Sequence, residues 1–186
     1  MHESTKGAKF IILDRDGVIN QDSDHYIKTV EEWIPIPGSL EAIARLNHAG
    51  YRVIVATNQS GLGRGYFDID TLNAMHQKMQ QELSALGAQI EAIFFCPHTP
   101  ETHCRCRKPL PGLIEDIAER LRIDIAEIPM IGDSLKDIQV ATAVGASPLL
   151  VLTGKGQVTI EQHRDDLTGV PIHKDLFTAV DALLTG

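Results

Sequence analysis

The sequence predicts an α/β fold, a doubly wound parallel sheet with helices on both faces, in three layers. Short apolar runs alternate with segments of helical periodicity from residue 10 to the end of the chain. The first run, residues 10–13, is continuously apolar, as expected for a strand that is buried on both faces. There is no internal repeat, low-complexity tract or linker in the 186 residues, which predicts one domain over residues 1–186 without a large cap domain.

The elements follow in a regular order. We expect strands over residues 10–13, 52–57, 92–95, 128–131, 148–152 and, more weakly, 170–172. Helical periodicity predicts helices over residues 39–49, 70–86, 112–121, 134–144 and 175–184. Strands that alternate with helices in this way imply right-handed crossovers between parallel neighbours.

Local patterns add detail to the second half of this scheme. Asp70 stands where it can cap the second predicted helix, and His76 fits the polar face of that helix. The stripe formed by Leu72, Met75, Met79 and Leu83 is predicted to be core. The three glycines within residues 61–65 indicate a flexible loop, because no dinucleotide-binding acid is suitably placed. Residues 18–37 are predicted to be irregular, and a segment of that length after a first strand is often functional.

Composition restricts the classes of partner. Formal net charge is −8, from 17 basic and 25 acidic residues, which argues against nucleic-acid binding and makes an anionic substrate depend on a local cationic site. No apolar run approaches the length of a membrane span, about 20 residues. The first ten residues, MHESTKGAKF, lack the apolar core of a signal peptide, so we expect a cytoplasmic protein, and we expect a monomer.

Two carboxylates follow the first predicted strand. Asp14 and Asp16 lie just past its carboxyl end, where open α/β sheets place their active sites, and alternate residues of an extended chain share a face. Carboxylates that close repel unless a cation or a shared proton intervenes. The pair therefore suggests a divalent metal with a nucleophile or an acid–base pair. The alternative is a turn in which Asp-x-Asp-Gly caps the next element.

Later strands and loops end in further polar groups. These are Thr57-Asn58-Gln59-Ser60 after the second strand, Arg107-Lys108-Pro109 before a helix, and Gly132-Asp133-Ser134 with Asp137 one helical turn on. The carboxyl ends of parallel strands meet at one edge of a sheet, so this order suits one shared site.

Four metal-ligating side chains cluster in one loop. Cys96, His98, Cys104 and Cys106 offer three sulfurs and one imidazole, a donor set that suits tetrahedral zinc (Zn²⁺) in a structural site. His103 is a less favoured substitute for His98, and free surface thiols are the alternative. Because Arg107 and Lys108 follow directly, zinc would fix a loop that delivers two cations to an anionic substrate.

The four polar motifs, in this order, resemble the haloacid dehalogenase superfamily of phosphohydrolases over residues 10 to about 155. The resemblance implies that Asp14 is a nucleophile that forms an aspartyl-phosphate and that Asp16 is the general acid and base. It also implies magnesium (Mg²⁺) held by Asp14, the backbone carbonyl of Asp16 and Asp133. Thr57 and Asn58 would donate hydrogen bonds to the phosphoryl group, and Lys108 would compensate its charge. For Asp137 two interpretations stay open, an orienting role and an exposed helix residue.

Two bacterial families within this superfamily share the cysteine loop, the heptose bisphosphate phosphatases and the histidinol-phosphate phosphatases. The sequence resembles the first in residues 57–65, TNQSGLGRG, and in residues 106–112, CRKPLPG. One departure is Ser134, where many heptose enzymes have a lysine; here Lys136 lies two residues on. The resemblance implies a small-molecule sugar bisphosphate as substrate, consumed in the synthesis of lipopolysaccharide or a related glycan.

A bisphosphate also agrees with the number of cations. Arg64, Arg107 and Lys108 exceed what one transferred phosphoryl group needs, so we expect Arg107 to bind the second phosphate. We assign substrate binding to Asn20 and Asp22 in the first long loop, with a solvated flap as the alternative, and to Asn58, Gln59, Ser60, Arg64 and Arg107. Two other functions are alternatives, an inactive zinc-stabilised binding module and a nucleic-acid end-repair phosphatase. The intact acidic motifs argue against the first, and the missing basic stripe argues against the second.

Overall fold

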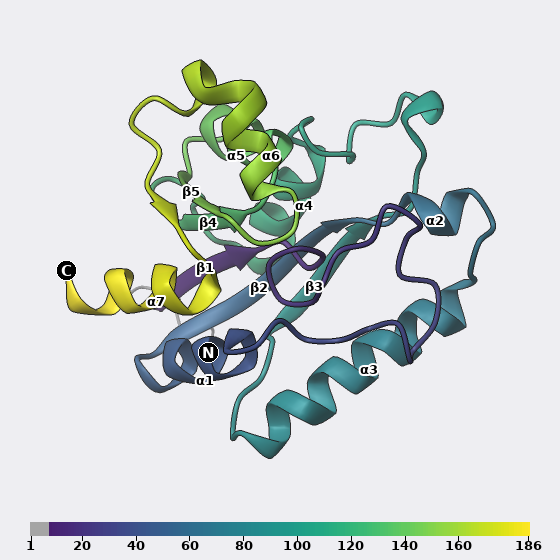
Figure 1. The fold of residues 1–186 in the computed structure, drawn as a ribbon, viewed down its shortest axis with the longest axis horizontal. Helices are drawn as coiled ribbons and strands as arrows, with labels where there is room; N and C mark the ends of the chain where they lie inside the picture. Colours follow the sequence, from purple (N-terminus) through teal and green to yellow (C-terminus); the bar gives the residue numbers. More distant parts are fainter. Residues whose placement is uncertain (1–7) are drawn as a thin grey trace.

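The computed structural model describes residues 8–186. Residues 1–7, which belong to the N-terminal segment used above to argue against a signal peptide, lie outside the described residues. Six strands form one parallel sheet in the order β3-β2-β1-β4-β5-β6 (Figure 1). Their bounds are β1 (Lys9–Leu13), β2 (Tyr51–Asn58), β3 (Ala92–Cys96), β4 (Pro129–Gly132), β5 (Ser147–Val151) and β6 (Ile172–His173). The predicted α/β class is confirmed, and each predicted strand is present within two residues of its expected bounds.

Helices cover both faces of the sheet, which gives the three predicted layers (Figure 1). One face carries α1 (Ser39–His48), α3 (Ile69–Ala85) and α7 (Leu176–Thr185), and the other carries α4 (Gly112–Leu121), α5 (Leu135–Ala143) and α6 (Gly156–His163). Alternation along β1 divides the core, because Ile11 and Leu13 pack toward the first set of helices and Ile12 toward the second. These three side chains are fully buried, as the continuous apolar run predicted.

Two α-helices within residues 8–186 were not predicted. The glycine-rich segment after β2 forms the short helix α2 (Ser60–Gly63), and the chain after β5 forms α6 and the 3₁₀ turn Arg164–Leu167. In α2 the glycines serve close packing, since a Cβ atom on Gly61 would collide with the Phe67 ring. The prediction of a flexible loop there was therefore wrong.

The predicted second helix is present as α3, but two details of it differ. The helix begins one residue earlier, and Asp68 caps it by accepting a hydrogen bond from the Thr71 amide at 2.8 Å, so Asp70 lies in the first turn. The predicted apolar stripe of α3 is fully buried, which confirms it as core. His76 was expected on a polar face; it is instead buried, with 8% of its surface exposed.

The long first loop, residues 18–37, is irregular as predicted, yet it is part of the core. Val18, Ile19 and Trp33 are fully buried. The Lys78 ammonium of α3 donates a hydrogen bond to the Trp33 carbonyl at 2.7 Å, which holds the loop against that helix. The loop is therefore fixed where it passes the carboxyl end of β1. Of the two residues for which a solvated flap was the alternative, Asn20 is fully buried and Asp22 is partly exposed.

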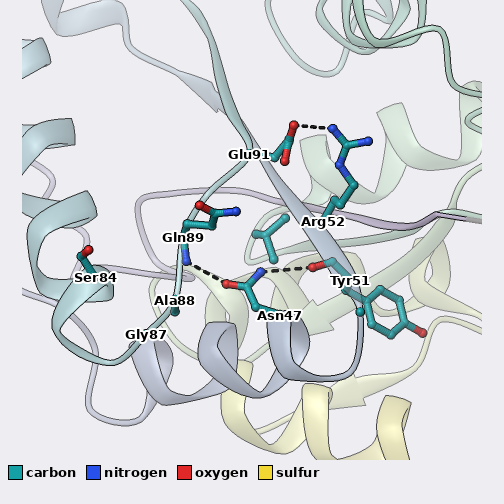
Figure 2. A pocket seen from close by; sticks show the side chains of 10 residues that line it. Asn47, Tyr51, Arg52, Ser84, Gly87, Ala88, Gln89 and Glu91 are labelled. Carbon is teal, nitrogen blue, oxygen red and sulfur yellow. Dashed lines mark hydrogen bonds and ion pairs between the residues drawn. The ribbon is translucent and has the colours of Figure 1, made fainter. Parts of the chain in front are cut away.

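A hollow of about 430 Å³ lies at the opposite end of the sheet, beside the start of β2 (Figure 2). Its polar groups pair with one another. The Asn47 amide accepts from the Gln89 backbone at 2.8 Å and donates to the Tyr51 carbonyl at 3.1 Å, and Arg52 pairs with Glu91. These contacts tie α1 and β2 to each other and to the loop before β3, which is a structural role. Within residues 8–186, no helix has both the length and the apolar character needed to cross a membrane.

Candidate active site

A cleft of about 800 Å³ opens at the carboxyl ends of β1, β2 and β4. The chain runs outward from β1 through β2 and β3 on one side and through β4, β5 and β6 on the other. Such a reversal of strand order is where open α/β sheets bind ligands. Among the residues that line the cleft are the predicted groups Asp14, Asp16, Asp22, Thr57, Asn58, Gln59, Ser60, Arg107, Lys108, Asp133 and Asp137.

Asp14 lies one residue beyond β1, and its backbone amide donates to the Ile131 carbonyl of β4 at 2.9 Å. Its Oδ1 atom is 3.2 Å from the Lys108 ammonium. Burial raises the pKa of Asp14 to about 7; the Lys108 charge opposes this rise, and the nearby carboxylates of Asp137 and Asp16 add to it. The group is thus held at the sheet edge, with one cation against it.

Lys108 is 2% exposed, and its ammonium is enclosed by acceptors. It donates to the Ala56 carbonyl at 2.7 Å and to Asp137 Oδ1 at 2.6 Å. Burial opposes its charge, but Asp137 and Asp14 outweigh burial and raise the pKa of Lys108 above its usual value. Asp137 is 1% exposed and also accepts from the Ser134 hydroxyl at 2.6 Å, so its interpretation as an exposed helix residue was wrong.

Asp133 enters the cleft from the end of β4. Its Oδ2 atom accepts from the Lys155 backbone amide at 2.7 Å, and its own carbonyl accepts from the Thr159 hydroxyl at 3.1 Å. A Cβ atom on Gly17 would collide with the Asp133 carboxylate, so glycine at this turn makes room for the acid. Burial, then the charges of Asp14 and Asp137, raise the pKa of Asp133 to about 8.

The acidic groups fit a hard divalent cation. Asp14, Asp133 and Asp137 each offer a carboxylate oxygen within 4.8 Å of the others. Oxygen donors are the ligands that Mg²⁺ prefers, and a cation would offset both causes of the raised pKa values of Asp14 and Asp133, first burial and then repulsion between carboxylates. Both carboxylate oxygens of Asp137 already accept hydrogen bonds, Oδ1 from Lys108 and Oδ2 from the Ser134 hydroxyl, so Asp14 and Asp133 are the better placed ligands. The Asp16 carboxylate is not part of this group, and a role of its backbone carbonyl as a magnesium ligand stays a prediction.

Asp16 is held by three side chains. The buried Arg15 guanidinium reaches both carboxylate oxygens, with Nε 2.9 Å from Oδ1 and Nη2 3.1 Å from Oδ2. The Asn20 and Gln59 amides each donate to Asp16 at 2.9 Å. Burial would raise the pKa of Asp16, but the Arg15 charge and these hydrogen bonds outweigh burial and lower it. Asn20 is fully buried and does not line the cleft, so its assignment to a sugar hydroxyl is corrected: its amide positions Asp16.

Thr57 and Asn58, at the end of β2, make different contacts. Thr57 is buried at the cleft wall and accepts a hydrogen bond from the Gln59 amide at 3.0 Å. The Asn58 side chain donates to the Lys108 carbonyl at 3.1 Å and accepts from the Lys108 amide at 3.0 Å. The Asn58 side chain thus fixes the backbone of Lys108, although a phosphoryl contact was predicted for Asn58.

Cationic groups surround the open part of the cleft. Arg107 lines it and donates to the His98 carbonyl at 3.3 Å. Lys136 and Lys155 also line it, and the Lys155 ammonium lies 3.4 Å from Asp22 Oδ2. Neither lysine was predicted as a site residue. Arg64, predicted to bind substrate, does not line the cleft and lies 3.5 Å from Glu101 instead, because α2 directs it toward the cysteine loop.

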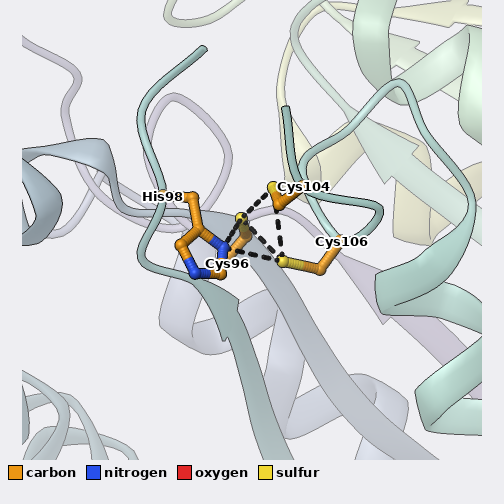
Figure 3. A group of neighbouring side chains, drawn as sticks. All are labelled: Cys96, His98, Cys104 and Cys106. Atoms are coloured by element: carbon orange, nitrogen blue, oxygen red, sulfur yellow. Dashed lines mark hydrogen bonds between the residues drawn. The ribbon is translucent and has the colours of Figure 1, made fainter. Parts of the chain in front are cut away.

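The predicted cysteine loop brings its four donors together (Figure 3). The Cys106 sulfur lies 3.0 Å from that of Cys96 and 3.6 Å from that of Cys104, and His98 Nδ1 lies 3.3 Å from Cys106. A tetrahedral zinc ion with Zn–S bonds of about 2.3 Å would separate its sulfurs by about 3.8 Å, so the cluster is close to that size. His103 is not part of the cluster.

Comparison with known proteins assigns the family. A HAD-hydrolase-like family model matches residues 105–179. The D-glycero-beta-D-manno-heptose-1,7-bisphosphate 7-phosphatase of Bordetella bronchiseptica is 56% identical over 154 residues, which are 83% of this chain and 86% of the relative. The enzyme of that name from Pseudomonas aeruginosa is 49% identical over 174 residues, 94% of this chain and 97% of the relative.

A solved structure agrees in fold as well as in sequence. The D,D-heptose 1,7-bisphosphate phosphatase of B. bronchiseptica, complexed with magnesium and phosphate, superposes with a TM-score of 0.92 at 52% identity. The match covers 95% of this chain and 98% of that one. This chain therefore belongs to the D,D-heptose 1,7-bisphosphate phosphatase family of phosphoric monoester hydrolases, within the haloacid dehalogenase superfamily.

Proposed function

We propose that this protein removes the 7-phosphate of D-glycero-D-manno-heptose 1,7-bisphosphate, and that it accepts the β anomer, which the names of its curated relatives specify. The observation that carries the proposal is the pairing of Asp14 with the buried Lys108 ammonium, 3.2 Å apart, in a cleft lined by further cations. The product would enter the synthesis of lipopolysaccharide or a related glycan in the cytoplasm.

Asp14 is the proposed nucleophile. Its carboxylate attacks phosphorus, the bond from phosphorus to the sugar oxygen breaks, and an aspartyl-phosphate forms on Asp14. Lys108 stands against Asp14 and balances the charge of the phosphoryl oxygens, while Thr57 offers them a hydroxyl donor. Asp137 keeps the Lys108 ammonium in this position through its 2.6 Å contact.

Asp16 is the proposed acid and base. The negative charge of a bound phosphate raises the pKa of Asp16 and favours the protonated form, which gives its proton to the departing sugar oxygen. The carboxylate left by that step accepts a proton from the water that attacks the aspartyl-phosphate. Inorganic phosphate and free Asp14 result, and Asp16 is protonated again. Arg15 stabilises the ionised form of Asp16 between these two transfers.

Magnesium would be held by Asp14, Asp133 and the Asp16 carbonyl, as the oxygen donors at the cleft indicate. When bound, it supplies positive charge that lowers the repulsion between two anions, the nucleophile and the phosphate. The related B. bronchiseptica enzyme was crystallised with magnesium and phosphate, which supports this assignment.

The second phosphate and the sugar would occupy the open part of the cleft. Arg107 is the proposed clamp for the phosphate that is not cleaved, with Lys136 and Lys155 as further cations on that wall. Ser60, Gln59 and Asp22 line the same space and are proposed to contact the sugar; Arg64 does not line it in this structure. Zinc at the four-donor cluster would fix the loop that ends in Arg107 and Lys108.

A phosphate-release screen tests the function. The purified protein with magnesium is given heptose 1,7-bisphosphate as the β anomer and as the α anomer, histidinol phosphate and 3′-phosphorylated DNA. We expect the highest kcat/KM on the β-heptose bisphosphate, with Asp14→Asn inactive on all four substrates. A preference for histidinol phosphate would support the alternative within the superfamily. Folded wild-type protein that turns over none of them would support an inactive binding module.

A further inference from the structure

A series of hydrogen-bonded side chains begins at Asp16 and leads away from the cleft. Arg15 lies between the two catalytic aspartates in the sequence, yet its side chain is fully buried. Two of its guanidinium nitrogens, Nε and Nη2, donate to Asp16, as described above. The third nitrogen, Nη1, points toward α3 and lies 3.2 Å from Nε2 of His76, a residue 61 positions later in the chain.

Only one assignment of donor and acceptor is possible for this contact. A guanidinium offers donors only, so His76 Nε2 must accept, and the imidazole is neutral with its proton on Nδ1. Burial, and then the positive charge of Arg15, lower the pKa of His76 to about 4, which keeps Nε2 free to accept at neutral pH. Leu72 and Met79, which flank His76 on the buried side of α3, are apolar and fully buried, so a polar residue here has a specific partner to serve.

We propose that His76 is a positioning residue for the reaction, which acts through Arg15 to fix the Asp16 carboxylate beside the cleft. The guanidinium is rigid and planar, so an acceptor at Nη1 sets the orientation of the Nε and Nη2 donors that hold Asp16. Helix α3, which contributes nothing to the lining of the cleft, thereby contributes to proton transfer. The inference rests on the proposed role of Asp16 as acid and base.

Two amide variants of His76 separate the effect of the hydrogen bond to Arg15 from the effect of a changed side-chain size. In His76→Gln the amide oxygen replaces Nε2 and can accept from Arg15, whereas in His76→Asn the shorter side chain places its oxygen near Nδ1 and cannot reach. Each variant is measured on the heptose bisphosphate, whose sugar alkoxide needs a proton to leave, and on p-nitrophenyl phosphate, whose phenolate leaves without one. The compared quantity is kcat/KM, which covers the steps up to departure of the leaving group.

His76→Asn is expected to lower kcat/KM on the sugar phosphate by about tenfold, through kcat, and on p-nitrophenyl phosphate by less than about threefold. His76→Gln is expected to remain within about threefold of wild type on both substrates. Equal losses on the two substrates, or a folded His76→Asn variant with wild-type kcat/KM on the sugar, would overturn the proposal. If His76→Asn does not fold, a wild-type leaving-group dependence in folded Arg15→Lys would overturn it as well.

The result is distinguishable from a failure of the proposed function. Asp16→Asn serves as the reference, because it should show the same dependence on the leaving group, only larger. If Asp16→Asn loses activity equally on both substrates, the role of Asp16 fails. If it shows the expected dependence and His76→Asn does not, the positioning role of His76 fails alone.

Discussion

The ammonium of Lys108 lies 2.6 Å from the Asp137 carboxylate, and both side chains are almost fully buried, at 2% and 1% exposed. Burying two charges is costly unless they pair, and loss of one partner leaves the other uncompensated. Here Lys108 also faces Asp14, so the pair supports both the core and the chemistry.

Lys108→Met is expected to lower kcat by more than about a hundredfold and the free energy of unfolding by about 3 kcal/mol. The double variant Lys108→Met/Asp137→Asn should recover much of that stability, because the buried Asp137 charge is no longer left unpaired, while activity stays low. Urea denaturation and steady-state kinetics on the same samples test this. Recovery of activity along with stability would show that Lys108 has only a structural role.

Arg107→Ala is expected to raise KM for the heptose bisphosphate with little change in kcat, because contacts to a phosphate that does not react are equal in ground and transition states. The effect should be smaller on a heptose monophosphate. Arg105→Ala is the matched control, since the Arg105 side chain is 86% exposed and pairs with Glu115. Equal effects of Arg107→Ala on both substrates would contradict the clamp.

Zinc should copurify at about one equivalent per chain, held by the four donors of the cysteine loop. His98→Ala is expected to lower the zinc content and to raise KM, because the loop that ends in Arg107 loses its anchor. His103→Ala, a substitution in the same loop outside the cluster, should retain zinc. Elemental analysis measures the zinc content of wild type and of both variants. A folded, active wild type with far less than one equivalent of zinc would rule out the site.

His76 should make stability depend on pH. Its pKa falls from 6.5 to about 4 on folding, so between these values the unfolded chain binds more protons than the folded one. Stability from this residue is therefore complete above pH 6.5 and is lost as pH falls toward 4, by up to about 3 kcal/mol. Urea midpoints at pH 7.5 and 5 should differ less for His76→Gln than for wild type, and an equal difference would argue against a buried neutral imidazole.

The sequence predicted much of the site because its groups follow strand ends. Asp14, Thr57 and Asp133 each stand at the carboxyl end of an apolar run, and the topology of a parallel sheet brings such ends together. The four donors of the cysteine loop were equally visible, since their spacing along the chain is short.

What the sequence did not predict depends on contacts between distant segments. His76 meets Arg15 across 61 residues, and no local pattern encodes that contact. A signal was nevertheless present, because His76 stands four residues after Leu72 and three before Met79, on the apolar stripe of its helix. Lys155 was not predicted as a site residue, because α6 lacks a clear apolar period and the Gly-Lys-Gly segment at its start does not match a phosphate-binding P-loop.

The central claim is that Asp14 carries the phosphate during turnover, and acid quenching tests it most directly. Wild-type protein with magnesium and heptose 1,7-bisphosphate is quenched within the first turnover, digested, and analysed by mass spectrometry. We predict a phosphate on the peptide that contains Asp14, heptose 1-phosphate as the released sugar, and neither in Asp14→Asn. A folded Asp14→Asn variant that releases phosphate at the wild-type rate, or a wild type that releases the 1-phosphate, would contradict the account.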